Sequence, residues 1–143
     1  MVEKIVLKGR GAVKGTGEGE ALVVPTHIHT VGLDARTGQI SEVGHPQRGM
    51  SVKGKVLVFG APAGSSDWGA TLFSVCRQGN GPVALICPRA VTMVLNGAIA
   101  ASVPMVVDLD KDPRKVINTG DLVKVNADKG IVEIHKPKKP AKS

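Results

Sequence analysis

Aromatic residues and cysteines are both scarce in this sequence. The 143 residues include two Phe, one Trp and no Tyr, so a hydrophobic core must be built from aliphatic side chains. The scarcity also argues against an RNA-binding protein of the kind that stacks bases on aromatic rings. The two cysteines, Cys76 and Cys87, form no C-x-x-C pair. We therefore expect free, buried thiols, and no zinc ion or iron–sulfur cluster held by this chain alone.

Long hydrophobic runs are missing as well. No segment approaches the roughly 18–20 consecutive apolar residues that a membrane span requires. The N-terminal residues also lack the apolar segment of a signal peptide. We therefore expect a cytoplasmic protein that is not bound to a membrane. A chain of 143 residues is long enough for one domain with its own core.

Acidic residues are absent from the C-terminal segment KPKKPAKS, residues 136–143, which carries four lysines. Of the net charge of +7, only +3 then belongs to the rest of the chain. We predict a domain over residues 1–135, followed by a flexible Lys/Pro tail at 136–143. Such a tail could contact nucleic acid, but a solvated chain end is the simpler interpretation, so nucleic acid is not an expected partner.

Short apolar runs alternate with helical patterns along the chain. This order is typical of a mixed α/β fold, here with a β-rich body and two helices around a short central sheet. The Gly-rich segment 9–17 and the charged segment 108–114 are predicted to be loops. Strands are predicted at residues 3–8, 18–24, 56–59, 83–86, 105–107, 122–126 and 131–135, and helices between the Ser65–Asp67 segment and Gly79 and over residues 90–101.

The segment from Lys55 to Gly79 combines the features of an anion-binding corner. An apolar run at 56–59 predicts a buried strand, a glycine-containing loop follows, and Ser65, Ser66 and Asp67 precede a helical pattern. Backbone N–H groups at the start of a helix favour negative charge, so a serine at this position is a candidate catalytic residue. The same residues also fit a plain N-cap, a role in which Ser and Asp are common.

Three histidines and an arginine are further candidates. His27 and His29 stand two residues apart, so in an extended chain they project to the same side, as a metal-binding pair would. No third ligand is near them, so substrate contact or an exposed strand edge is the stronger interpretation. The imidazole of His45 could act near neutral pH, as histidines commonly do, and Arg48 could clamp a carboxylate, although either side chain could instead cap its loop.

A series of short motifs connects these candidates. The sequence contains, in this order, Gly-Glu-Gly-Glu-Ala-Leu-Val at 17–23, Gly32-Leu33-Asp34 with Thr37-Gly38, His45-Pro46 with Arg48-Gly49, Val52-x-Gly54-Lys55-Val56-Leu57, Gly64-Ser65-Ser66, Asn96-Gly97-Ala98-Ile99, Val103-Pro104, and Thr119-Gly120-Asp121-x-Val123-x-Val125. Each motif is modest alone, but their order and spacing are specific. Over roughly residues 8–135 the sequence resembles the small subunit of aconitase X enzymes.

The resemblance implies a swivelling β/β/α domain and a hydro-lyase, or dehydratase, that is active only with a large subunit. In that family the large subunit holds an iron–sulfur cluster on its own cysteines, and the small subunit supplies a serine. The matching serine is Ser65, which would remove the proton α to a carboxylate while the metal assists departure of hydroxide. Contact with the substrate would then come from Gly64, Ser66, His27, His29, His45 and Arg48.

The chain departs from the family pattern where substrate contact is expected. The family dehydrates phosphomevalonate or cis-3-hydroxy-L-proline. Relatives have a small hydroxyl residue and an aromatic residue where this chain has Ile28 and His29, and a basic residue where it has Ala63. Asp67-Trp68 replaces a Thr-Gly or Val-Gly pair. A lost cation and an added carboxylate disfavour a phosphorylated substrate at this corner, so the substrate is expected to be a hydroxy acid that need not be either known one.

A non-catalytic carrier or binding module is the main alternative. Swivelling domains also serve as phosphohistidine carriers, and such a carrier needs an exposed histidine on a glycine-rich turn before a helix. None of the four histidines precedes a helical pattern. The sequence therefore favours the dehydratase subunit.

Overall fold

The chain folds into strands at both ends and alternating strands and helices in between. The computed structural model describes residues 2–24, 33–41, 43–44, 46–59, 68–88 and 92–137. The strands are β1 (Val2–Lys8), β2 (Arg10–Val13), β3 (Thr16–Val24), β4 (Val56–Phe59), β5 (Ala84–Ile86), β6 (Met105–Val107), β7 (Leu122–Asn126) and β8 (Ile131–Pro137). The helices are α1 (Trp68–Arg77), α2 (Thr92–Ala101) and α3 (Pro113–Val116).

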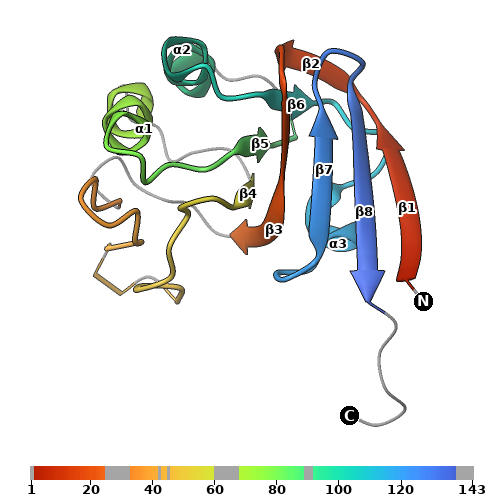
Figure 1. Cartoon of the computed structure of the whole chain (residues 1–143), viewed down its shortest axis with the longest axis horizontal. Coiled ribbons are helices and arrows are strands. Elements are labelled where there is room, and N and C mark those ends of the chain that lie inside the picture. Colours follow the sequence, from red (N-terminus) through yellow and green to blue (C-terminus); the bar gives the residue numbers. More distant parts are fainter. Residues whose placement is uncertain are drawn as a thin grey trace, which may run out of the picture.

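Within these residues the strands form one mixed sheet in the order β1-β8-β7-β3-β4-β5-β6-β2. The two edge strands, β1 and β2, are separated in the chain by Gly9 alone, so the sheet curls back toward its own start (Figure 1). This curl is held by Gly9 N–H, which donates to the carbonyl of Gly130 between β7 and β8 at 2.7 Å. The result is a sheet that is nearly barrel-shaped.

Strand β3 belongs to both halves of the sheet. Its first half pairs antiparallel with β7, from Thr16 opposite Asn126 to Glu20 opposite Leu122. Its second half pairs parallel with β4, from Ala21 to Val24. Beyond β4, strands β5 and β6 continue the parallel part, whereas β1, β7 and β8 make up the antiparallel part.

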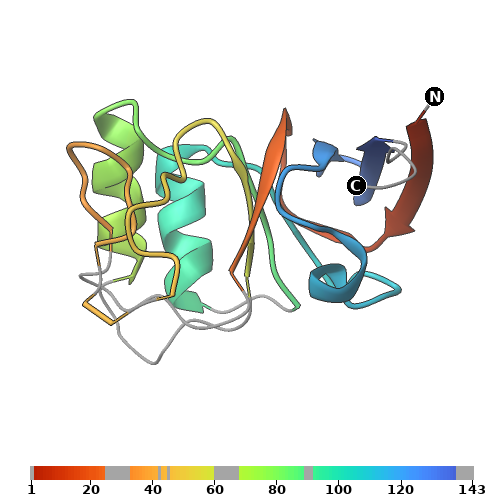
Figure 2. The same ribbon diagram turned by 90° about the horizontal axis from the view of Figure 1, so that it is seen from below.

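The layers follow from this division. Figure 2 shows α1 and α2 side by side against one face of the parallel strands, with β1, β7 and β8 on the other side. One core fills the space under the helices and includes Leu22, Leu57, Leu72 and Leu85. A second core lies inside the curled sheet and includes Leu7, Val58, Val123 and Ile134. Both are almost wholly aliphatic, as the composition predicts, and the β/β/α layering confirms the expected fold class.

Two predicted loops contain regular structure. Within the segment 9–17, residues 10–13 form β2, which pairs with β6. Gly11 is needed there because a Cβ at this position would overlap the carbonyl oxygen of Ala127. Within 108–114 the helix α3 begins, with Asp112 as its N-cap and Pro113 in its first turn. The prediction of a loop was therefore wrong for residues 10–13, 16–17 and 113–114, because these stretches are too short for a periodic pattern.

The remaining predicted elements are present, with small shifts in their ends. The second helix begins at Thr92, and β8 continues to Pro137, so Lys136 and Pro137 are paired with β1 rather than part of a free tail. One face of α1 carries its buried side chains, whereas Phe73 is 38% exposed. Leu72 and Val75 take that face, and Phe73 is turned away from it because each helical residue rotates the next by about 100°. No helix among the described residues is long and apolar enough to cross a membrane.

Candidate functional site

The carboxyl ends of the parallel strands meet at one edge of the sheet. Val24 of β3 lies opposite Phe59 of β4, and Ile86 of β5 lies opposite Val58 of β4 and Val106 of β6. The strands therefore stop at nearly the same level. In open α/β sheets ligands bind beyond this edge, where the strand-to-helix connections lie.

Most of the predicted site residues belong to connections that leave this edge. His27 and His29 follow β3 in the sequence, and Gly64, Ser65 and Ser66 stand between the end of β4 and the start of α1. These five residues and His45 lie outside the described residues, as do Ala63 and Asp67. Their roles therefore remain predictions, and Arg48 is the site residue whose surroundings the structure describes.

The long connection between β3 and β4 carries Arg48. Its described residues, 33–41, 43–44 and 46–55, are called the excursion below. Leu33, Ile40 and Val52 of this excursion are buried in the core under the helices. Backbone bonds tie its turns together: Gly49 N–H donates to the Ile40 carbonyl at 2.7 Å, and Ile40 N–H donates to the Met50 carbonyl at 2.8 Å. The described part of the excursion is therefore an anchored platform.

Gln47 joins this platform to the edge of the sheet. Its side-chain amide, Nε2, donates to the carbonyl of Val23, the penultimate residue of β3, at 2.7 Å. The bond is partly buried and spans 24 residues of sequence. It brings the segment 46–49 to the strand that leads to His27 and His29. The turn that contains Arg48 therefore lies beside the end of β3.

The guanidinium of Arg48 is available at this edge. The residue is exposed, and among the residues that the structure describes it has no carboxylate or hydrogen-bond partner. An unpaired arginine offers a planar fork of donors that matches a carboxylate or a phosphate. Of the two interpretations of Arg48, an anion clamp agrees better with this environment than a loop cap.

The Thr119-Gly120-Asp121 motif bonds to β3 on its β7 side. The hydroxyl oxygen of Thr119 accepts from Val23 N–H at 3.0 Å, and Gly120 N–H donates to the Ala21 carbonyl at 2.9 Å. Asp121 is buried, and its Oδ2 accepts from the backbone of Asn118 and from Lys136 Nζ. This motif therefore has a structural role: it completes the hydrogen bonding of β3 where β7 no longer reaches.

An ion pair at the end of β6 was missed by sequence reasoning. Asp108 follows β6 with a positive φ of 55°, and its Oδ2 accepts from Arg10 at 3.1 Å to Nε and 2.8 Å to Nη2. Its N–H donates to the carbonyl of Pro88, which follows β5. The partners are 98 residues apart, so no local pattern could have revealed them.

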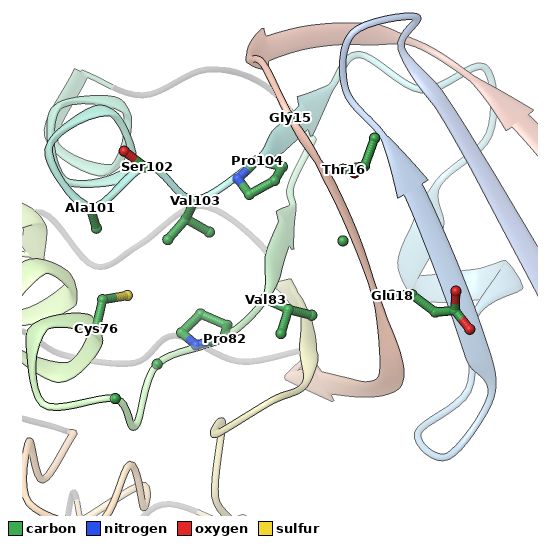
Figure 3. Close-up of a pocket in the computed structure, with 13 residues that line it drawn as sticks. Gly15, Thr16, Glu18, Cys76, Pro82, Val83, Ala101, Ser102, Val103 and Pro104 are labelled. Carbon is green, nitrogen blue, oxygen red and sulfur yellow. The ribbon is translucent and has the colours of Figure 1, made fainter.

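A cavity lies at the opposite, amino-terminal edge of the parallel strands. Its volume is about 530 Å³. Figure 3 shows Cys76 of α1 and Ser102 after α2 on the helix side of this cavity, with Thr16 and Glu18 of β3 across from them. None of the predicted site residues lines it. Burial raises the pKa of the Cys76 thiol, which makes this sulfur a poor nucleophile at neutral pH.

The described residues offer little to a metal ion. They contain no group of three or more His, Cys, Asp or Glu side chains placed to hold one. Neither cysteine forms a disulfide bond: Cys87 is buried as expected, and Cys76 is half-buried. His135 lies in β8, where its Nε2 contacts Glu133 Oε1 at 2.9 Å. It does not precede a helix, as a phosphohistidine of a carrier domain would.

Comparison with known proteins agrees with the geometry. A family model described as "Aconitase X swivel domain" matches residues 6–134. A phosphomevalonate dehydratase small subunit from Methanosarcina acetivorans is 38% identical over 135 residues, which is 94% of this chain and 94% of the relative. The corresponding protein from Thermococcus gammatolerans is 36% identical over 90% of this chain and 96% of its own length.

Two solved structures share the fold. The crystal structure of Thermococcus kodakaraensis aconitase X in its holo form superposes with a TM-score of 0.84 at 36% sequence identity, over 91% of this chain and 98% of that one. The solution NMR structure of a UPF0107 protein gives the same TM-score at 35% identity and the same coverage. The likeness thus extends over nearly the whole length of both chains.

Proposed function

Because the chain belongs to the aconitase X swivel domain family, we propose that it closes the active site of a two-subunit dehydratase with the carboxyl edge of β3–β6. It is a subunit of a hydro-lyase, since the curated relatives named above are dehydratase subunits of which this chain covers 94% and 96%. The observation that supports this proposal is the Gln47–Val23 hydrogen bond, because it brings the turn with Arg48 to the carboxyl end of β3.

The partner in this proposal is a large subunit, as the words "small subunit" in the relatives' names imply. That partner would hold the iron–sulfur cluster, since the described residues of this chain offer no set of ligands for it. When bound there, the cluster would act as a Lewis acid on the leaving hydroxide. This chain would bind and orient the substrate and carry the base. A cytoplasmic location remains a prediction.

Ser65 is the proposed base. It precedes α1, a helix of ten residues whose first-turn N–H groups have no partners within the helix. The partial positive charge at that end would stabilise an alkoxide, and thus favour removal of the proton α to the substrate carboxylate. Gly64, Ser66, His27, His29 and His45 are the proposed contacts to the rest of the substrate, with Arg48 on its carboxylate.

The proposed substrate is a hydroxy acid. Phosphomevalonate is the first candidate, since several relatives at 36–38% identity carry its name. A cis-3-hydroxy-L-proline-like acid is the second, favoured by Ala63 and Asp67, which leave the corner before α1 without the cation that a phosphate group would need.

Co-expression with the large aconitase X subunit tests the proposal. We expect a stable complex that dehydrates one of the two candidate acids, detected as loss of water by mass spectrometry. Isolation of a monomer that ignores the large subunit would refute the subunit role.

Replacement of the serine tests the base separately. Ser65→Ala in that complex should lower kcat by about 100-fold or more, the scale of a lost acid–base group. Ser74→Ala, on the exposed side of α1, is the matched control and should leave kcat unchanged. If Ser65→Ala retains full turnover, Ser65 is not the base.

A further inference from the structure

At the proposed site, strand β3 extends four residues beyond the end of its pairing with β7. Its pairing with β7 ends at Glu20, whereas its pairing with β4 continues to Val24. On the β7 side, the polar backbone groups of Ala21 and Val23 therefore need other partners. The turn before β7 supplies most of them: Ala21 bonds to Gly120 and Asp121, and Val23 N–H donates to Thr119.

The carbonyl of Val23 is satisfied differently. Its donor is the side chain of Gln47, which comes from the excursion and not from the sheet. The main-chain carbonyl of Gln47 meanwhile accepts from Met50 N–H at 3.0 Å and closes the turn that contains Arg48. Gln47 thus holds the turn at one end by its backbone and the strand by its side chain.

We propose that Gln47 is a positioning residue, which fixes the Arg48 guanidinium relative to the end of β3 so that it meets the substrate carboxylate. This inference rests on the proposed function, because it requires an anionic substrate at the carboxyl edge. The physical basis is the cost of ordering. An arginine on a loose turn must lose conformational freedom when it binds, whereas one on a fixed turn has already lost it.

The consequence is specific to substrate binding. In this proposal Arg48 binds a carboxylate that is present in both the substrate and the transition state. Displacing Arg48 therefore weakens the binding of both equally, which is a loss of uniform binding. Uniform binding affects KM and leaves kcat unchanged. A merely structural role of Gln47 would instead lower the amount of active enzyme and so lower the apparent kcat.

The test uses the complete two-subunit enzyme. Gln47→Met keeps the length of the side chain and removes the donor, and we expect KM to rise about three- to tenfold with kcat within twofold of wild type. Gln39→Met is the control, because Gln39 is exposed on the same excursion and its hydrogen bonds are made by its backbone. Should Gln47→Met not fold, Gln47→Asn also breaks the bond by shortening the side chain.

A double variant distinguishes positioning from other effects. If Gln47 acts through Arg48, then Gln47→Met should raise KM no further in an Arg48→Ala background. The inference is overturned if the full increase persists in that background, or if Gln47→Met behaves as Gln39→Met does.

Hydrogen exchange separates this inference from the proposed function. The amides of Gly49 and Met50 donate to the carbonyls of Ile40 and Gln47 and hold the turn, so their exchange should be faster in Gln47→Met than in wild type. Unchanged exchange would overturn the positioning role of Gln47 whether or not the enzyme is a dehydratase. If the wild-type complex has no dehydratase activity but exchange is faster in the variant, the proposed function is refuted, whereas the role of Gln47 in holding the turn is supported.

Discussion

Arg48 is the residue whose environment best defines the proposed site. It is exposed and lacks a partner among the described residues, while the turn that carries it is bonded to Ile40, Met50 and Val23. A mobile, solvated arginine would pay much of its binding energy for ordering, but this one is presented on a fixed turn. This combination favours the proposed binding role, since the backbone of Arg48 is restrained while its guanidinium has no partner among the described residues.

Removal of this charge should weaken substrate binding. We expect Arg48→Ala to raise KM by about 10- to 100-fold, since a hydrogen bond to a charged group contributes about 1.5–3 kcal/mol. Arg36→Ala is the matched control, because Arg36 lies on the same excursion and pairs with Asp34 at 3.5 Å. Equal KM values for the two variants would remove Arg48 from the site.

Among the elements, the turn before β7 has the clearest single role. Its residues Thr119, Gly120 and Asp121 supply the bonds that β7 no longer gives to β3. Gly120 can do so because its φ is +98°, a conformation that residues with a Cβ rarely adopt. The Thr-Gly-Asp motif is one of those that carry the family resemblance, although it lies apart from the predicted catalytic residues in the sequence. These hydrogen bonds give it a structural role.

The conformation of this turn can be tested by stability. Gly120→Ala should lower the free energy of unfolding by about 1 kcal/mol or more through backbone strain, since no atom would clash with the new Cβ. Gly120→Asn should lose less, because Asn tolerates the left-handed region better. Chemical denaturation of the isolated chain measures both, and equal losses in the two variants would contradict the explanation.

For the whole molecule, closure of the sheet depends on contacts between the two chain ends. β1 pairs with β8 over its full length, and Glu133 of β8 contacts Lys4 of β1 and His135 of its own strand. The hydrogen bond from His135, with help from Lys4, lowers the pKa of Glu133. A carboxylate with a lowered pKa stabilises the fold above its ordinary pKa of about 4.3, and this contribution is lost as the pH falls through the lowered value.

The pH dependence of stability should therefore change when this carboxylate is removed. We expect the denaturation midpoint of the wild type to fall on acidification below about pH 4.5, and Glu133→Gln to show a shallower fall in the same range. Glu18→Gln, which removes an exposed carboxylate from β3, serves as control. Parallel curves for Glu133→Gln and wild type would show that the pair contributes nothing to acid stability.

The sequence by itself determined the type of most elements and the class of the fold. Runs such as Val56–Phe59 and the alternation in 122–135 record local burial, and the aliphatic composition predicts the two cores. Residue motifs also sufficed for the family. Their roles at the site, Ser65 above all, were proposed from the same motifs and are still to be tested.

Only the tertiary structure decided which of these elements meet. It paired β2 with β6, placed Lys136 on Asp121, turned Phe73 outward and bonded Gln47 to Val23. Each of these depends on segments far apart in the chain, or on which face of a helix the sheet covers. Local periodicity cannot encode such choices, because the free energy that selects them comes from packing and hydrogen bonding between elements and not from within one.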